Sequence, residues 1–430
     1  MAVIEKILSD ITLPVFASVK RLFDSTCLDD EGIHRCIRRQ LVGDNLQRCF
    51  RPGWKVAITA GSRGIRRIPV ILREIATVLK EYQVEPFVIG CMGSHGGDAV
   101  GQKSILTHLG ITDENIGVPV TTSDTLVAAG LTSDGRIVYA DSAAAAADAL
   151  VVVNRIKPHT AFHAPVESGL QKMLAIGLGK QKGADACHAF GFNGMYENIR
   201  EYSQVIMGRL NVALGVGIIE NAFGDVFDCI IMPGSDIRRL EPELLEHARS
   251  LMPGLPFDRL DVLIVSEMGK DISGSGMDTN VIGRYPISGM SGGPIIGKIV
   301  VLDLTHGSEG NAHGVGFADF TSKKLFDKIT FDLTYPNCLT NKVTGPAKIP
   351  PIMPSDKYAI AAAIKTCGNV DPATVRALWI KNTHTLERLY LSSALLQEVK
   401  NRTDLSIVEY PSEISFTAEG FVVDDLWNVP

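Results

Sequence analysis

The sequence has no CxxC pair and no strongly basic or long apolar segment. Its 8 cysteines are scattered over 430 residues, which is typical of a reducing compartment and argues against a disulfide scaffold or a zinc knuckle. The net charge of −6 provides no basic surface, so we expect no nucleic-acid partner. No apolar run approaches a membrane span, and the first residues lack a signal-peptide pattern. These absences predict a cytoplasmic protein with no membrane partner.

Several short catalytic motifs are also missing. Residues 61–64 (GSRG) do not form GxGxxG, so a dinucleotide site has weak support. No GxSxG elbow is present, so a serine hydrolase has weak support as well. His159 and His163 are four residues apart, as in HExxH, but the glutamate is missing and Pro158 disfavours a helix there.

Strands and helices alternate in the first half of the chain. Apolar runs at 54–59, 86–91 and 148–154 predict strands, and a helical period runs from 68 to 82. This βαβ pattern predicts a mainly parallel sheet covered by helices. Ligands of such sheets bind outside the carboxyl ends of the strands.

Polar side chains follow three of these predicted strands. Arg63, His95 and His159 each lie in a strand-end loop, so we expect them at one rim of the sheet. A cation in such a position suits a phosphate or carboxylate group. Imidazole is the usual acid–base group near neutral pH and a common metal ligand.

The second half is again α/β. A Pro/Gly break at 253–257 precedes predicted strands at 261–266 and 298–304, each followed by a glycine-rich loop. We therefore expect two α/β domains with the active-site cleft between them. The predicted boundaries are 1–257 for a catalytic, cofactor-binding domain, 258–400 for a second domain, and 401–430 for a segment that packs back on the first.

Residues 154–192 concentrate the reactive side chains. This segment holds His159, His163, Lys172 and His188, joined by glycines and small residues. A lysine among glycines can carry a covalent cofactor link. The residues alone leave two alternatives open, a hydrolase and a cofactor site.

Several motifs in this order resemble the nickel-pincer lactate racemase family and its 2-hydroxyacid racemase and epimerase relatives. They are GSH at 93–95, PH at 158–159, Lys172, and ACHAFG at 186–191. Lys172 and His188 are 16 residues apart, which matches the family's spacing. Further motifs, GSGMDTN at 274–280 and HGVGFADFT at 313–321, resemble the second domain of these proteins.

The resemblance implies a role for each matching residue. It implies that Lys172 carries a pyridinium-3-thioamide-5-thiocarboxylic acid mononucleotide, that His188 completes the coordination of its nickel, and that His95 and His159 are the two catalytic histidines. Arg63 and Ser94 would contact the cofactor or substrate. We assign tentative substrate contacts to His163, Lys270 and Arg284.

The implied activity is racemisation or epimerisation at C2 of a 2-hydroxy acid. Hydride transfer to the lysine-linked nickel-pincer nucleotide would give a planar keto acid, and two histidines would handle the hydroxyl proton on opposite faces. The expected partners are the small-molecule 2-hydroxy acid and the cofactor-biosynthesis proteins. The alternatives are a non-catalytic cofactor- or metal-binding protein of this fold and a metal-dependent hydrolase.

The chain departs from the family pattern near the expected substrate. His159 and Lys172 are 13 residues apart, which is longer than in lactate racemases, and the extra residues include His163, Pro165 and Glu167. These departures favour a 2-hydroxy acid other than lactate.

Overall fold

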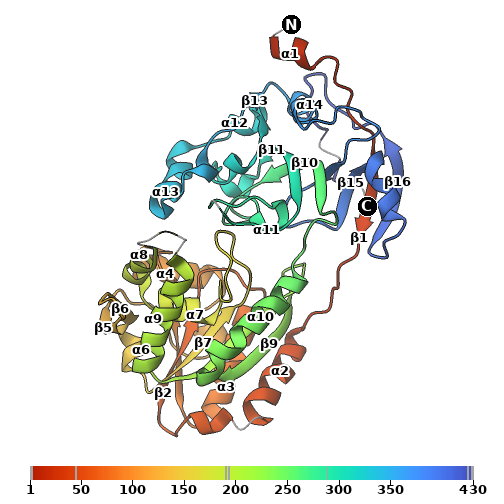
Figure 1. Ribbon diagram of the computed structural model, residues 1–430. Coiled ribbons are helices and arrows are strands. Elements are labelled where there is room, and N and C mark those ends of the chain that lie inside the picture. The colour runs from red at the N-terminus through yellow and green to blue at the C-terminus, as the bar shows by residue number, and fades with distance from the viewer. Residues whose placement is uncertain are drawn as a thin grey trace. The chain divides into compact units, whose positions relative to one another are not determined.

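The structure is a computed structural model that describes residues 3–43, 46–188, 191, 194–287, 289–423 and 426–427 (Figure 1). Ala189 and Phe190 of the ACHAFG motif lie outside the described residues. The chain forms two compact units, Asp24–Met252 and Met1–Phe23 with Pro253–Pro430. We call them the N-terminal unit and the C-terminal unit and describe each by itself.

The N-terminal unit contains a six-stranded sheet in the order β4-β3-β2-β7-β8-β9. All neighbouring strands pair in parallel except β8 and β9, and a separate two-stranded sheet pairs β5 with β6. The elements are α2(Asp30–Gly43), β2(Lys55–Ala60), α3(Ile68–Glu81), β3(Glu85–Gly90), α4(Ala99–His108), α5(Asp113–Ile116), β4(Val120–Thr121), β5(Leu126–Leu131), β6(Ile137–Asp141), α6(Ser142–Ala146), β7(Ala149–Arg155), α7(Leu170–Lys172), a π-helical turn η2(Met173–Gly177), α8(Lys180–His188), α9(Met195–Arg209), β8(Val212–Glu220), β9(Val226–Pro233) and α10(Ile237–Leu251).

Two apolar cores cover the two faces of this sheet. On one face, side chains of α2 and α3 pack against alternate residues of the strands, such as Val151 and Val153 of β7. On the other face, Leu150 and Val152 pack against α7, η2, α9 and α10. Successive residues of a strand point to opposite faces, so a central strand with both faces buried is apolar throughout.

The C-terminal unit contains an eight-stranded sheet in the order β13-β12-β11-β10-β14-β15-β1-β16. The strands from β13 to β14 are parallel, and β15, β1 and β16 add antiparallel pairs. The elements are α1(Val3–Leu8), β1(Phe16–Arg21), β10(Arg259–Met268), α11(Thr279–Ile282), β11(Ile295–Leu304), β12(Phe320–Ser322), α12(Lys323–Phe326), α13(Phe331–Asn341), β13(Ile352–Met353), α14(Asp356–Thr366), β14(Ala377–Ile380), β15(Arg388–Ser392), α15(Leu396–Val399) and β16(Leu405–Ser412).

The two ends of the chain differ from the expected domain boundaries. We expected residues 401–430 to pack on the first domain, and β16 does pair with β1, which the sequence placed there. Yet β1 also pairs with β15, so both strands lie in the sheet of the C-terminal unit. The reason is that β1 fills the gap between β15 and β16, where its backbone groups complete two antiparallel ladders.

The predicted fold class is confirmed. Both units are α/β, and the sheet of the first is mainly parallel, as the strand–helix alternation indicates. Among the described residues, every helix is too short or too polar to cross a membrane.

Candidate functional site

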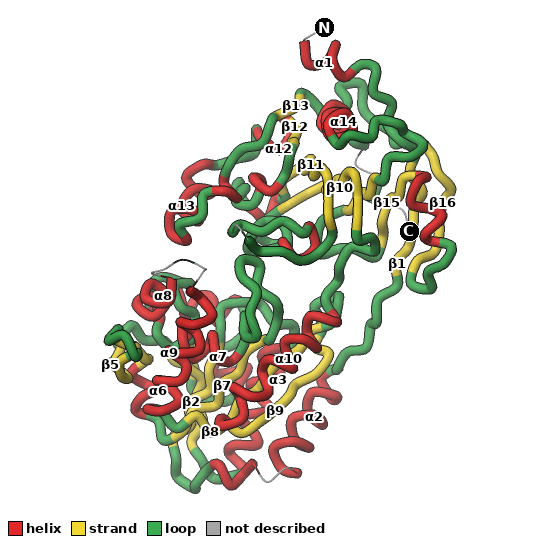
Figure 2. The backbone as a smooth tube through the Cα atoms, in the orientation of Figure 1, coloured by secondary structure: helices red, strands yellow, loops and turns green. Residues whose placement is uncertain are grey.

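Three strand-end loops of the N-terminal unit carry the predicted rim residues. The chain leaves β2, β3 and β7 through irregular loops that hold Arg63, His95 and His159. Loops are drawn green in Figure 2, where β2 and β7 are labelled. Because β3, β2 and β7 are neighbours and run in parallel, these loops leave the same edge of the sheet. The sequence-based placement of the three residues agrees with this topology.

The loop after β3 presents His95 at the surface. The side chains of Ser94 and His95 are exposed, and Nδ1 of His95 lies 2.6 Å from Oγ of Ser62, which comes from the loop after β2. A Cβ on Gly93, whose φ is +59°, would lie 3.0 Å from Cγ2 of Ile176. The histidine loop therefore packs closely on η2.

Arg63 is exposed on the loop after β2. The protein around its guanidinium and the nearby charge of Arg155 lower the pKa of Arg63. Arg155, at the end of β7, pairs with Glu220 at 2.6 Å and donates a hydrogen bond to the carbonyl oxygen of Gly64. Because Glu220 already partners Arg155, Arg63 is the better placed of the two cations to meet an anionic ligand.

The loop after β7 is closed at its base and holds His159 in a fixed setting. The backbone groups of Lys157 and Ser168 pair with each other. Nδ1 of His159 accepts the N–H of Ala161 at 3.0 Å, and its ring lies 4.6 Å from the ring of Phe162. The neutral imidazole in this arrangement carries its proton on Nε2.

Glu167 organises this loop from within. Its side chain is fully buried and accepts the backbone N–H groups of His159 and Ala164. Nδ1 of His163 lies 3.2 Å from one carboxylate oxygen, and Arg249 donates to the same oxygen at 2.8 Å. His163 is thus held by a residue of its own loop, and the loop is not helical, so the HExxH-like pairing with His159 does not form.

Lys172 lies where an α-helical turn changes into a π-helical one. The N–H of Leu178 donates to the carbonyl oxygen of Met173 at 3.0 Å, an i→i+5 bond. A Cβ on Gly177 would lie 2.4 Å from Sδ of Met173 and 3.1 Å from the carbonyl oxygen of Cys91. The helix of Lys172 therefore packs directly on the end of β3. Isolated π-turns within helices often occur at functional sites.

His188 ends α8 with its tautomer fixed. Its Nδ1 lies 2.7 Å from the carbonyl oxygen of Ala184, which can only accept, so Nδ1 carries the proton and Nε2 keeps the lone pair. Metal-binding histidines commonly donate their second N–H in this way. Asn198 of α9 supports the end of α8 by donating to the carbonyl oxygen of Cys187 at 2.8 Å.

Electrostatics link these residues. Burial lowers the pKa of Lys172 to about 8, and the charge of Arg63 acts in the same direction. Burial holds the pKa of His159 well below its ordinary value, and the charges of Lys172, His188, Lys157 and Arg63 add to this effect. Burial also lowers the pKa of His188. Arg63, His159, Lys172 and His188 are thus brought together in one electropositive region.

The two predicted substrate residues outside this unit have other partners. Lys270 belongs to the loop after β10, where its backbone N–H donates to Ser308 and its ammonium donates to the carbonyl oxygen of Gly274. The guanidinium of Arg284 pairs with Asp319 at 2.6 Å and donates to backbone carbonyl oxygens. The substrate contacts predicted for Lys270 and Arg284 therefore stay predictions.

Two buried charged residues near the site were not predicted from the sequence. Lys180 pairs with Asp141 at 3.0 Å and donates to the carbonyl oxygen of Gly90, which fixes the end of β3. Glu241 of α10 lies against the start of α7. No local signal in the sequence indicates the role of Glu241, because its partner Gln171 lies 70 residues away.

No group of three histidine, cysteine or acidic side chains is arranged to hold a metal ion within the part of the chain that the structure describes. A metal held mainly by a bound cofactor needs only one protein ligand, and His188 has the tautomer for that role.

No protein-family model matches the sequence, and no curated protein matches it. Among solved structures, the fold is similar to that of the lactate racemase apoprotein from Thermoanaerobacterium thermosaccharolyticum. The TM-score is 0.54 at 14% sequence identity, and the match covers 84% of this chain and 99% of the other. At this identity the comparison establishes a shared two-domain α/β fold.

Proposed function

We propose that this protein is a nickel-pincer-dependent racemase or epimerase of a 2-hydroxy acid. The observation that carries the proposal is the grouping of His159, Lys172, His188 and Arg63 in one electropositive region of a chain with a lactate racemase-like fold. Each of these residues was assigned its role from the sequence motifs, and each has local chemistry that suits the role.

Lys172 and His188 fit the lysine-linked mononucleotide and its nickel. With a pKa of about 8, roughly one Lys172 amine in ten is neutral and nucleophilic at pH 7, compared with far fewer for an ordinary lysine. Nε2 of His188 supplies the lone pair that a metal ion needs. When bound, the group would supply a hydride acceptor and thereby avoid a carbanion at C2.

The cations and histidines of the rim suit the substrate. Arg63 and Lys157 provide positive charge beside His159 for a carboxylate. The low pKa of His159 keeps it neutral at pH 7, which is the form that can take up the hydroxyl proton. Uptake at Nε2 requires the tautomer protonated at Nδ1 and therefore the loss of the Ala161 N–H bond. His95, oriented by Ser62, would serve the opposite face.

Intact-mass and metal analysis of protein co-produced with the cofactor-building enzymes tests the proposal. We expect a mononucleotide adduct that maps to Lys172, together with nickel, and neither in Lys172→Ala. Loaded protein is then screened against 2-hydroxy acids for stereochemical exchange at C2, with His95→Ala as the control. An unmodified mass would overturn the cofactor assignment. Loading without exchange of any 2-hydroxy acid would favour the non-catalytic binding alternative.

A further inference from the structure

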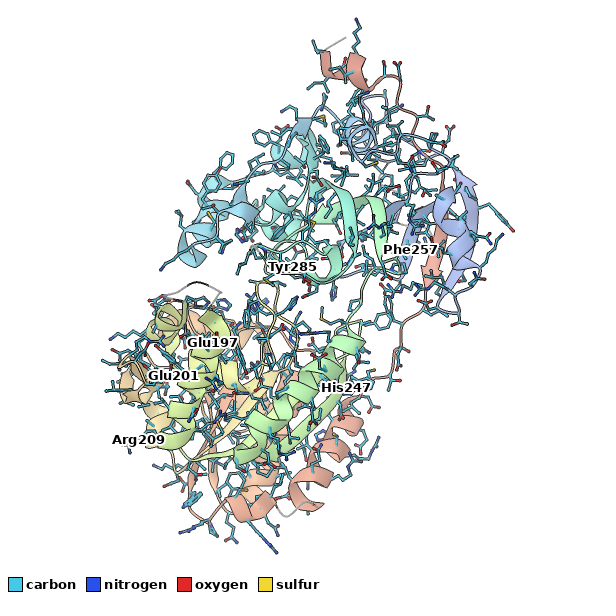
Figure 3. All side chains as sticks on the ribbon, viewed as in Figure 1. Glu197, Glu201, Arg209, His247, Phe257 and Tyr285 are labelled. Carbon is cyan, nitrogen blue, oxygen red and sulfur yellow. The ribbon has the colours of Figure 1, made fainter. Side chains whose placement is uncertain are left out.

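Helix α10 contacts the site at two places. It runs from Ile237 to Leu251 and carries Glu241 and Arg249, which are about two helical turns apart. His247, labelled on this helix in Figure 3, places its ring 5.5 Å from the ring of Phe227 in an edge-to-face contact. This contact packs the side chain of His247 on α10 against Phe227 of β9.

Glu241 holds the start of the helix that carries Lys172. Its carboxylate is buried and accepts the backbone N–H of Gln171 at 3.0 Å and the side-chain N–H of Gln171 at 3.1 Å. The backbone of Leu170 also donates to it. The first N–H groups of a helix have no partner within the helix, so a carboxylate there fixes where the helix begins.

Gly169 makes room for this carboxylate. A Cβ at this position would lie 1.9 Å from Oε1 of Glu241, a distance that no side chain can occupy. The carbonyl oxygen of Gly169 accepts the side-chain N–H of Asn154, which ties the same residue to the end of β7. The glycine is therefore required by the position of Glu241.

Arg249 holds the loop that carries His159. It donates to Glu167 at 2.8 Å, and Glu167 accepts the backbone N–H of His159. Because the Glu167 side chain is fully buried, it depends on these donors for compensation. Arg249, which lies on α10 outside the loop, is a cation that pairs with the Glu167 carboxylate.

We propose that α10 is a positioning element that sets Lys172 and His159 relative to each other, Glu241 acting through the start of α7 and Arg249 acting through Glu167. The inference rests on the proposed function only for calling Lys172 and His159 reactive. Neither Glu241 nor Arg249 is a catalytic residue, because each acts through another side chain.

The first test measures Lys172 in the full chain without cofactor. Acetic anhydride labelling at a series of pH values, with peptide mapping, gives the pH at which Lys172 becomes reactive. In Glu241→Gln a loosened start of α7 would expose the Lys172 ammonium to water, so we expect this midpoint to rise from about 8 toward the ordinary lysine value. A rise of one unit lowers the labelling rate at pH 7 about tenfold. The control is Glu74→Gln, which removes another buried carboxylate, one that pairs with Arg38 on α2.

A second variant approaches the same contact from the other side. Gly169→Ala forces the carboxylate away and should shift the Lys172 midpoint as Glu241→Gln does. In the Glu241→Ala background the space is open, so Gly169→Ala should add no further shift. An unchanged midpoint in folded Glu241→Gln, or a shift of the same size in Glu74→Gln, would overturn the role of Glu241.

The third arm follows His159 by the NMR titration of its ring protons, assigned with His159→Gln. Arg249→Met should raise the pKa of His159 toward its ordinary value, and Arg249→Lys should restore part of the shift. An unchanged titration in folded Arg249→Met would overturn the role of Arg249. These readouts need no cofactor, so they stand even if Lys172 carries no adduct and the proposed function fails.

Discussion

Glu241→Gln should change how the stability of the N-terminal unit depends on pH. Burial raises the pKa of Glu241 to about 7 from an ordinary value of 4.5, despite the hydrogen bonds from Gln171 and Leu170 that oppose the shift. The Glu241 carboxyl group therefore ionises at a higher pH in the folded state than in the unfolded state. The contribution of Glu241 to the free energy of unfolding is fully present below pH 4.5 and is lost as pH rises through 7.

The size of the effect follows from the shift. A difference of about 2.5 pKa units at ~1.4 kcal/mol per unit corresponds to ~3 kcal/mol of stability lost between pH 4.5 and pH 8. Glutamine cannot ionise and removes this loss. It also weakens the hydrogen bonds to Gln171 by about 1–3 kcal/mol, but that cost is present at every pH. The free energy of unfolding of the variant should therefore gain on the wild type by ~3 kcal/mol across this range.

Urea unfolding between pH 4.5 and 8 measures this difference. Of the 3 tryptophans, Trp54 alone belongs to the N-terminal unit, so a Trp379→Phe/Trp427→Phe background reports on that unit. The difference between variant and wild type should grow steadily with pH. A difference that stays constant from pH 4.5 to 8 would refute the reasoning, because it would mean that Glu241 ionises equally in both states.

Four further substitutions give expected outcomes. Lys172→Met should stabilise the N-terminal unit at pH 7 by up to ~3 kcal/mol, since the folded state disfavours the ammonium, and the gain should vanish as pH rises from 8 to 10.5 in urea titrations. Lys180→Met should destabilise the unit by roughly 3–5 kcal/mol at pH 7, because it leaves Asp141 buried without its cation, and an unchanged urea midpoint would contradict this. His95→Ala should lower C2 exchange by about 10²–10⁴-fold in loaded protein, with an unchanged circular dichroism spectrum, whereas Ser62→Ala should cost less.

The framework of the N-terminal unit could be predicted from the sequence because its signals are local. The apolar run of β7, the helical period of α3 and the glycines after β2 and β3 each occupy a short window. Parallel pairing of these strands then brings Arg63, His95 and His159 to one edge of the sheet. For these three residues, the order of strands and loops along the chain was enough to predict their place at this edge.

The residues that support the site could not be predicted in this way. Glu241 and Arg249 act on partners 70 and 82 residues away, and an isolated glutamate or arginine on a helix is most often solvated. The residue type of Glu241 does not indicate that its side chain is buried. Gly169 offered a partial signal, because a glycine at the start of a helix can mark a close approach of another group.

The ends of the chain show a second limit. The strand character of residues 16–21 and 405–412 is visible in the sequence, but a strand pattern does not reveal which sheet the strand joins. The pairing of β1 with both β15 and β16 spans almost the whole chain. Only the positions of the free sheet edges decide such a pairing.

The π-helical turn after Lys172 has a consequence for how the chain tolerates insertion and deletion. A π-turn holds one residue more than an α-turn, so it offsets by about 100° the directions in which side chains before and after it project. Deleting one residue from Met173–Gly177 would let the backbone run as regular α-helix and would relieve the wide turn. It would also rotate Lys172 away from its present direction, from which its charge acts on His159. The 16-residue interval between Lys172 and His188 contains this π-turn and a break at Lys180, whose φ is +52°, so a deletion would change both the direction of Lys172 and its distance from His188.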